Sequence, residues 1–259
     1  MGDRHPYFSA EKPRVLAHRG LVPRDSAGVV DNTVAAFAAA HAAGAEYIES
    51  DCHVTADGVV VLFHDTDLVR VAGDSRRVAD VPHDELAHLM AGLGGLATAA
   101  DTLAAFPDVR FNLDVKAPDA AVPLGRIVAP HADRVLLTSF ADARRRAAMD
   151  AARAAGGTPA TSAGQATVAR VLAGVASGSR TIVRRALRGI HALQVPERTG
   201  ALRIVGPRFL RLVHEAGVEV HVWTVNDPLD MERLLDLGVD GLVTDRADLA
   251  LQVTRRRTQ

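Results

Sequence analysis

The chain is very poor in cysteine, because Cys52 is the single one among its 259 residues. One cysteine cannot form a disulfide within the chain, and this favours a reducing compartment. No run of apolar residues approaches the ~18 that a transmembrane helix needs, so we expect no stable membrane anchor. Residues 1–12 carry several charged side chains and lack the apolar stretch of a signal peptide. These absences predict a soluble cytoplasmic protein.

The chain also has almost no net charge. Its 30 Lys and Arg residues oppose 31 Asp and Glu residues, which leaves a formal charge of -1. This balance argues against a surface dedicated to nucleic acid or to an anionic membrane. Lysine itself is scarce, since all the basic residues except Lys12 and Lys116 are arginines. Lys12 and Lys116 are therefore candidates for positions at which the chemistry requires lysine itself.

A unit of helix, glycine and strand recurs along the chain. Residues 33–43 form an Ala-rich helical pattern that ends at Gly44, and an apolar strand pattern follows at once. Glycine suits the position just past a helix because it adopts the left-handed conformation without a Cβ clash. Either Asn32 or Thr33 can cap this helix, and Asp227 can cap another.

The alternation predicts eight parallel strands, each followed by a helix. The expected strands are 14–18, 46–53, 110–116, 134–139, 159–163, 192–196, 219–225 and 241–245. Eight such units in about 250 residues are typical of a TIM (β/α)8 barrel. We expect one barrel domain over residues 1–259, with an oligomeric state that the sequence leaves open.

An extra apolar run, residues 59–63, follows a hairpin-type turn at 56–58. It predicts an antiparallel strand that folds back on the second barrel strand and brings His64 level with Asp51. Residues 65–108 then form the longest stretch without an expected strand. We expect short helices at 83–91 and 99–106 in this segment, and we expect the segment to cover the barrel mouth.

Polar side chains gather where the expected strands end, and in this fold such ends form the active site. Glu49 and Asp51 are two residues apart on one strand and face the same way, as do Asp114 and Lys116 on the next. Carboxylates that converge from neighbouring strands, with no cysteine nearby, suit one hard divalent cation such as Mg²⁺ or Ca²⁺.

The residues around this cluster complete a site for phosphoryl chemistry. His18 and His64 could serve as general acid and base, because the histidine pKa lies near neutrality. Arg19 and Lys116 supply fixed positive charge. A cation with an arginine and a lysine around one pocket stabilises a phosphoryl transition state by positioning and electrostatics.

Taken in order, these motifs resemble the glycerophosphodiester phosphodiesterase family over roughly residues 15–249. The matching motifs are His18-Arg19-Gly20, Asp31-Asn32-Thr33, Glu49-x-Asp51, His64-Asp65, Asp114-x-Lys116, Trp223-Thr224-Val225-Asn226 and Thr244-Asp245. The resemblance implies a TIM barrel that uses a divalent metal to hydrolyse glycerophosphodiesters to glycerol 3-phosphate and an alcohol. It also implies that the glycerol 2-hydroxyl attacks phosphorus and that water opens the resulting cyclic phosphate.

The resemblance assigns a role to each matching residue. Two histidines form the acid–base pair, three carboxylates bind the metal, two cations hold the phosphate, and a tryptophan lines the glycerol or leaving-group side. In that order they are His18 and His64; Glu49, Asp51 and Asp114; Arg19 and Lys116; and Trp223.

The chain departs from the family at Asp31 and Asp114, where Glu is common. The shorter Asp114 would reach the metal through water or after a small strand shift. The loop 21–30 is longer than expected and could alter substrate choice. Asn32-Thr33 has a complete explanation as a helix cap. Asp245 is interpreted first as a residue that closes the last turn or binds a basic neighbour.

Two other functions fit the same residues. One is a lysophospholipase D or sphingomyelinase-D-like activity on acylated lipids, for which an apolar channel would be needed. The segments 21–30 and 86–97 are the sequence's candidates for it, and neither is convincingly amphipathic. The other is a non-catalytic phosphate-binding barrel, which the shortened Asp114 would allow.

Overall fold

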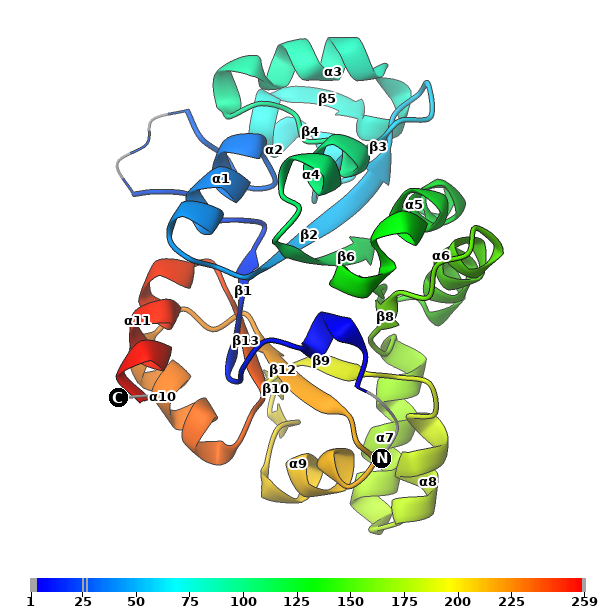
Figure 1. Ribbon diagram of the computed structural model, residues 1–259, viewed down its shortest axis with the longest axis vertical. Helices are drawn as coiled ribbons and strands as arrows, with labels where there is room; N and C mark the ends of the chain where they lie inside the picture. The colour runs from blue at the N-terminus through cyan, green and yellow to red at the C-terminus, as the bar shows by residue number, and fades with distance from the viewer. Residues whose placement is uncertain (1–3, 25, 27, 258–259) are drawn as a thin grey trace.

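The computed structural model describes residues 4–24, 26 and 28–257 (Figure 1). Eight parallel strands run in the order β8-β7-β6-β2-β1-β13-β12-β9, and an isolated parallel bridge between Ser162 and Ala192 joins the two ends. The predicted TIM barrel is therefore confirmed. The barrel strands are β1 (Arg14–His18), β2 (Tyr47–Val54), β6 (Arg110–Val115), β7 (Val135–Thr138), β8 (Ala160–Thr161), β9 (Ala192–Pro196), β12 (Glu219–Trp223) and β13 (Gly241–Thr244).

Helices surround the barrel and begin where the sequence places caps. The Thr33 hydroxyl accepts a hydrogen bond from the Ala36 amide, so Thr33 rather than Asn32 caps the first helix. Asp227 accepts from the amides of Leu229 and Asp230, as predicted. The barrel helices are α1 (Val34–Ala42), α5 (Ala121–Val128), α6 (Asp142–Ala154), α7 (Gln165–Ser177), α8 (Arg180–Ala186), α9 (Pro207–His214), α10 (Pro228–Leu237) and α11 (Ala247–Arg257).

The extra strand is present and lies where the hairpin pattern predicts. Strand β3 (Val60–Leu62) pairs antiparallel with β2, with Cys52 opposite Leu62. The Phe63 amide donates to the Asp51 carbonyl at 2.8 Å. This register brings His64 beside Asp51, which confirms the expected juxtaposition.

Residues 65–108 contain two short strands that the sequence analysis did not predict. Strands β4 (Asp67–Leu68) and β5 (Asp74–Arg77) form a small antiparallel pair around helix α2 (Val69–Ala72). They are too short and too polar for alternation to reveal them. The predicted helices follow as α3 (His83–Met90) and α4 (Ala99–Ala105). Figure 1 shows these elements beside β2 and β3.

A second short hairpin follows β9. It consists of β10 (Arg198–Thr199) and β11 (Leu202–Arg203), and all four residues are exposed. Short 3-10 helices complete the chain: Pro6–Phe8, Val78–Asp80, Ala91–Leu93, Pro118–Ala120 and Ala129–Arg134.

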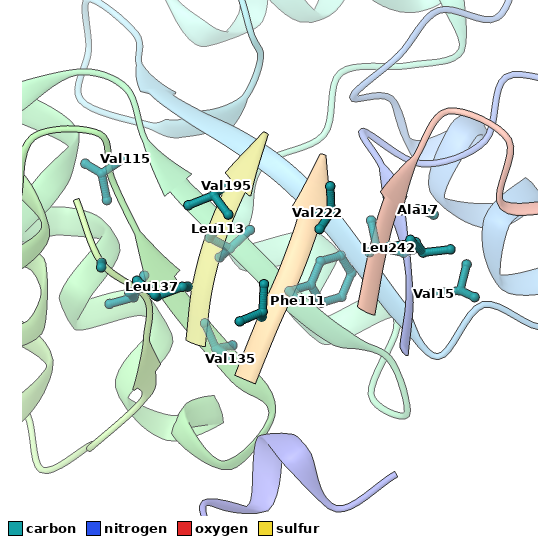
Figure 2. Packing of buried hydrophobic residues seen from close by; sticks show 14 of the residues in the cluster. Val15, Ala17, Phe111, Leu113, Val115, Val135, Leu137, Val195, Val222 and Leu242 are labelled. Atoms are coloured by element: carbon teal, nitrogen blue, oxygen red, sulfur yellow. The ribbon is translucent and has the colours of Figure 1, made fainter. Parts of the chain in front are cut away.

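The main core lies between the strands and the surrounding helices (Figure 2). Side chains that alternate along each strand, such as Val15 and Ala17 on β1, point into this layer. Cys52 is fully buried there, as expected for a small hydrophobe facing away from the barrel lumen. The opposite faces of the strands therefore carry the residues that enter the barrel.

The amino-terminal end of the barrel is closed by the segment before β1. Tyr7 and Phe8 pack against Tyr47 from β2. Arg14 is buried in the same region, where its Nε donates to Glu219 at 2.8 Å. The base is thus filled, and the open end of the barrel is the carboxyl end. In the described part of the chain, no helix has the length and apolar character needed to cross a bilayer.

Candidate active site

A cavity of about 600 Å³ lies at the carboxyl ends of the barrel strands. All of the predicted site residues line it: His18, Arg19, Glu49, Asp51, His64, Asp114, Lys116 and Trp223. Sequence positions more than 200 residues apart, such as His18 and Trp223, therefore meet in one place. None of the described residues between 65 and 108 lines this cavity, although we expected that segment to cover the mouth.

Strand register explains why these side chains meet. His18 on β1 pairs with Glu49 on β2, and Asp51 on β2 pairs with Asp114 on β6. Paired residues in a sheet have side chains on the same face, and here that face is the barrel lumen. The register thus places the three carboxylates on two neighbouring strands, with His18 beside the first.

Lys116 binds two of the three carboxylates. Its Nζ lies 2.9 Å from Asp51 Oδ1 and 2.8 Å from Asp114 Oδ2. Burial alone would raise the pKa of Asp51, but Lys116 and Arg19 outweigh it and hold that pKa below its usual range. Burial raises the pKa of Asp114 despite Lys116. Lys116 thus keeps Asp51 charged within the lumen.

Asp51 has further donors from the connection that follows β1. Arg19 Nε lies 3.2 Å from Asp51 Oδ2, and Asn32 Nδ2 donates to the same oxygen at 3.1 Å. The Ser50 hydroxyl in turn donates to Asn32 Oδ1 at 2.6 Å. Asn32 therefore positions a site carboxylate, a role that its interpretation as a helix cap did not include.

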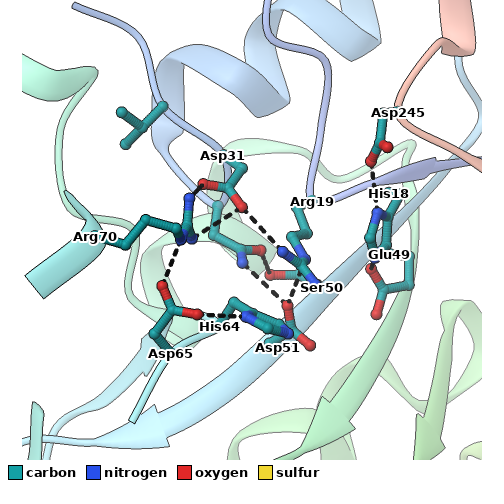
Figure 3. A network of polar contacts seen from close by, with 12 residues as sticks. His18, Arg19, Asp31, Glu49, Ser50, Asp51, His64, Asp65, Arg70 and Asp245 are labelled. Atoms are coloured by element: carbon teal, nitrogen blue, oxygen red, sulfur yellow. Dashed lines mark hydrogen bonds and ion pairs between the residues drawn. The ribbon is translucent and has the colours of Figure 1, made fainter. Parts of the chain in front are cut away.

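Each histidine of the expected acid–base pair has a carboxylate on its Nδ1 (Figure 3). His18 Nδ1 lies 2.6 Å from Asp245 Oδ1, and His64 Nδ1 lies 2.7 Å from Asp65 Oδ1. Because a carboxylate only accepts, Nδ1 carries the proton in both rings, and Nε2 remains for substrate. Burial lowers the pKa of His18, but the hydrogen bond to Asp245 and the Glu49 charge outweigh it and raise that pKa.

This geometry agrees with the comparison with known protein families. A model described as the glycerophosphoryl diester phosphodiesterase family matches residues 18–249. The chain belongs to this family. It is 38% identical over 242 residues to "Probable glycerophosphodiester phosphodiesterase 2" of Mycobacterium tuberculosis, a match that covers 92% of this chain and 89% of that protein.

Solved structures of similar proteins share the fold. A glycerophosphodiester phosphodiesterase of Thermotoga maritima is 26% identical, with a TM-score of 0.69, covering 95% of this chain and 100% of that chain. A phosphodiesterase of Oleispira antarctica, in complex with the product sn-glycerol-3-phosphate, is 20% identical, with a TM-score of 0.72. That match covers 94% of this chain and 97% of the other.

Proteins of the glycerophosphoryl diester phosphodiesterase family generally depend on a divalent metal. Glu49 Oε2 and Asp114 Oδ1 are buried oxygens with no hydrogen-bond partner among the described residues. Burial and the Asp51 charge raise the pKa of Glu49 to about 8. A hard cation would satisfy both oxygens and restore the charge of Glu49, so the donor set fits one.

The carboxylate oxygens of Glu49, Asp51 and Asp114 do not surround a common point. Across residues 4–24, 26 and 28–257, no group of three or more His, Cys, Asp and Glu side chains forms a ready metal cluster. Lys116 instead contacts one oxygen of Asp51 and one oxygen of Asp114. A cation held by these carboxylates would have to share them with Lys116.

The sequence analysis did not predict a charged network that lies beside His64. Arg70 from α2 binds Asp31 at 2.9 Å and also contacts Asp65 through its Nε, at 2.5 Å. Asp31 in turn lies 3.2 Å from Arg19. The network thus joins His64 and Arg19 through two aspartates and one arginine. Arg70 lies outside every motif, so a single sequence held no signal for it.

Proposed function

We propose that this chain hydrolyses glycerophosphodiesters to glycerol 3-phosphate and an alcohol, with His18 and His64 as the acid–base pair. The observation that carries this proposal is the pair of histidine–carboxylate contacts facing one cavity that also holds three carboxylates, an arginine and a lysine. Family membership supports the same activity, because proteins of this family hydrolyse glycerophosphodiesters. The printed name of the Oleispira structure, with sn-glycerol-3-phosphate as product, supports it as well.

Glu49, Asp51 and Asp114 are proposed to hold one divalent cation, Mg²⁺ or Ca²⁺. When bound, the cation would supply positive charge to a phosphoryl oxygen. Arg19 binds the phosphate from the β1 end, where Asp31 and Asp51 fix its guanidinium. Lys116 adds a second positive charge, and Trp223 lines the substrate side of the cavity. Because Arg19 and Lys116 are already held in place, they need no reorganisation when negative charge develops on the phosphoryl oxygens.

The two histidines move the protons. A neutral ring accepts the proton of the attacking hydroxyl at its Nε2. The other ring starts protonated on both nitrogens, and its Nε2 donates a proton to the oxygen of the leaving alcohol as the bond from that oxygen to phosphorus breaks. Asp245 and Asp65 fix the tautomer that leaves Nε2 available, and they stabilise each ring when it becomes charged. Because Asp245 and Asp65 act through the rings, they are positioning residues.

The test is release of glycerol 3-phosphate from glycerophosphocholine and glycerophosphoethanolamine by the purified protein. The protein is treated with EDTA and then supplied with Mg²⁺ or Ca²⁺. We expect turnover to return with metal and to fall by about 10²-fold or more in His18→Ala and in His64→Ala. The matched control is His88→Ala, because His88 is exposed on α3 and does not line the cavity.

Two results would overturn the proposal. No turnover with either metal, while the diesters still bind, would favour a non-catalytic phosphate-binding barrel. Full activity in both cavity-histidine variants would remove the acid–base assignment. The single buried cysteine supports a reducing, cytoplasmic compartment for the activity, and fractionation of the producing cell tests that proposal.

A further inference from the structure

The positive charge of the chain is concentrated in one segment. Residues 165–218 contain nine arginines and two glutamates, a local charge of +7, although the whole chain carries a formal charge of -1. No Asp or Glu occurs anywhere between residues 151 and 196. The near-neutral balance that argues against an anionic partner therefore describes the chain as a whole, and this segment departs from it.

The nine arginines lie on three neighbouring helices and one hairpin. Helices α7, α8 and α9 pack against one another, and Figure 1 shows them together at the lower end of the view. The β10–β11 hairpin comes directly before α9 in the chain. We call this surface the arginine face. All nine of its arginines are exposed: Arg170, Arg180, Arg184, Arg185, Arg188, Arg198, Arg203, Arg208 and Arg211.

Few carboxylates neutralise the arginine face. Arg180 pairs with Glu215 at 2.9 Å, and Arg203 pairs with Glu197 at 3.3 Å. These are the segment's two glutamates, and Glu197 also pairs with Arg233 of α10. The other arginines have no ion pair with any residue that the structure describes: Arg170, Arg184, Arg185, Arg188, Arg198, Arg208 and Arg211.

This crowding of like charges has an electrostatic cost. Arg180 and Arg184 are four residues apart on α8, and like charges at that spacing destabilise a helix. Arg208 and Arg211 lie three apart on α9, so they share one side of that helix. An extended anionic surface placed against the arginine face would turn this repulsion into attraction.

Two large aliphatic side chains are exposed among the arginines. Ile182 on α8 is 44% exposed, and Leu202 in the hairpin is 61% exposed. The one Phe, Tyr or Trp of residues 165–218 is Phe209, and it is buried. Surfaces that bind single-stranded nucleic acid add exposed aromatic rings for bases to stack on, and this segment exposes none. Arginines that surround exposed aliphatic side chains are instead typical of proteins that lie on a lipid surface.

We propose that the arginine face docks reversibly on an anionic phospholipid bilayer. The guanidinium groups contact lipid phosphates and carboxylates, while Ile182 and Leu202 enter the boundary between head groups and hydrocarbon. Thr199 and Leu202 of the hairpin also line the active-site cavity, so the docking surface reaches the cavity rim. The contact is peripheral and needs no membrane-spanning helix. It depends on surface charge and is independent of the chemistry proposed above.

Vesicle binding by the full chain tests this inference. The purified protein is mixed in EDTA, which prevents metal-dependent turnover, with vesicles of phosphatidylcholine alone or of phosphatidylcholine and phosphatidylserine. Sedimentation of the vesicles measures the bound fraction. We expect the anionic vesicles to bind about 10²-fold more tightly, because each arginine near such a surface tightens binding about fivefold. Added salt should weaken this binding by screening the charges.

Arg185→Gln/Arg188→Gln removes two unpaired charges from the arginine face. It should weaken binding to the anionic vesicles about 20-fold and leave the melting temperature unchanged. The matched control is Arg77→Gln/Arg126→Gln, which changes the net charge equally at two exposed arginines on β5 and α5. This control should bind the anionic vesicles as tightly as the natural chain does.

Three results would overturn the inference. The first is equal binding of the natural chain to both kinds of vesicle. The second is the same loss of binding in both double variants, because net charge rather than the arginine face would then decide it. The third is tighter binding to a DNA duplex or single strand than to the anionic vesicles at equal salt, which would assign the arginine face to nucleic acid.

Discussion

At the residue scale, the site depends on carboxylates that orient other side chains. Asp245, interpreted from the sequence as a residue that closes a turn or binds a basic neighbour, contacts His18 Nδ1 at 2.6 Å. Asn226 donates to its other oxygen at 2.7 Å. Asn226 also accepts from the Asp245 amide at 2.9 Å, so both the backbone and the side chain of Asp245 are fixed. A residue held this firmly orients the histidine that it contacts.

Asp245→Asn should lower kcat for glycerophosphocholine about 10²-fold, with little change in KM. The amide can donate to Nδ1 and so favours the wrong tautomer of His18, which removes general acid–base catalysis. Steady-state kinetics with added metal measure the effect. Asp248→Asn is the control, because Asp248 pairs with Arg246 on the surface. An unchanged kcat in Asp245→Asn would contradict the positioning role.

Lys116 gives a second prediction at this scale, for metal addition and removal. Lys116→Met leaves Asp51 and Asp114 without their ammonium partner, and should cost about 3 kcal/mol of unfolding free energy in EDTA. Mg²⁺ or Ca²⁺ should then raise the melting temperature more in this variant than in the natural chain, because the Lys116 ammonium group no longer occupies the carboxylates. Calorimetry with and without metal measures both effects.

The chain's other lysine is the matched control. Lys12 also contacts two carboxylates, Asp240 and Glu219, but these lie at the opposite end of the barrel. Lys12→Met should therefore lower stability without enlarging the response to metal. The same metal response in both variants would show that the cation does not use the carboxylates around Lys116.

At the element scale, Gly20 marks a tight approach between the connection from β1 to α1 and helix α1 itself. Gly20 has φ +88°, and a Cβ placed on it would lie 2.7 Å from the Ala36 carbonyl carbon. The connection therefore brings two backbones closer together than any side chain allows. It also carries Arg19 and Asn32, both of which contact Asp51. The tight approach is part of how the site is assembled.

Gly20→Ala should lower the free energy of unfolding by about 2 kcal/mol or more, because it combines a left-handed backbone with a steric clash. Gly58→Ala is the control, since Gly58 has φ +86° but nothing within 4 Å of the added Cβ. Urea denaturation measures the free energy of unfolding of both variants. Gly58→Ala reports the backbone cost alone, so the further loss in Gly20→Ala is due to the steric clash. Equal losses would mean that the close approach to Ala36 carries no penalty.

At the scale of the whole molecule, the two ends of the barrel differ in how they are filled. The carboxyl end holds the open cavity, while the amino end is filled by Tyr7, Phe8 and the Arg14–Glu219 pair. His221 is fully buried beside this pair, with Nε2 3.0 Å from Glu219. Burial and the Arg14 charge lower the pKa of His221 to about 3, and the charge of Asp240 does not offset them.

This buried histidine makes the stability of the whole barrel depend on pH. The folded chain does not protonate His221 until about pH 3, whereas the unfolded chain protonates it near its ordinary pKa of 6.5. Between those values the unfolded state binds more protons, so stability falls as pH falls, by up to about 1.4 kcal/mol per pH unit.

His221→Gln should flatten the fall in stability between about pH 6.5 and pH 4, because glutamine can donate to Glu219 but does not titrate. Urea denaturation of both chains over this range measures the two slopes. Other groups also titrate there, so the difference between the slopes is the quantity that matters. Parallel curves would contradict the assignment to His221.

The sequence by itself determined the order of the barrel elements and the identity of the chemical groups. The strands at 14–18 and 192–196 coincide with their predicted bounds. Caps such as Thr33, glycines after helices and alternating apolar residues act over a few neighbouring residues, so one sequence contains their whole signal. The motif residues likewise predicted which side chains would line the cavity.

Only the tertiary structure decided which partner each of these groups has. Asp245 with His18, Arg70 with Asp31, and Lys116 with both Asp51 and Asp114 are contacts between distant or unpatterned positions. The cavity wall is of the same kind, because residues of α7 and of the β10–β11 hairpin both line it. Such contacts depend on register and closure, which join residues far apart in the chain and leave no local periodicity.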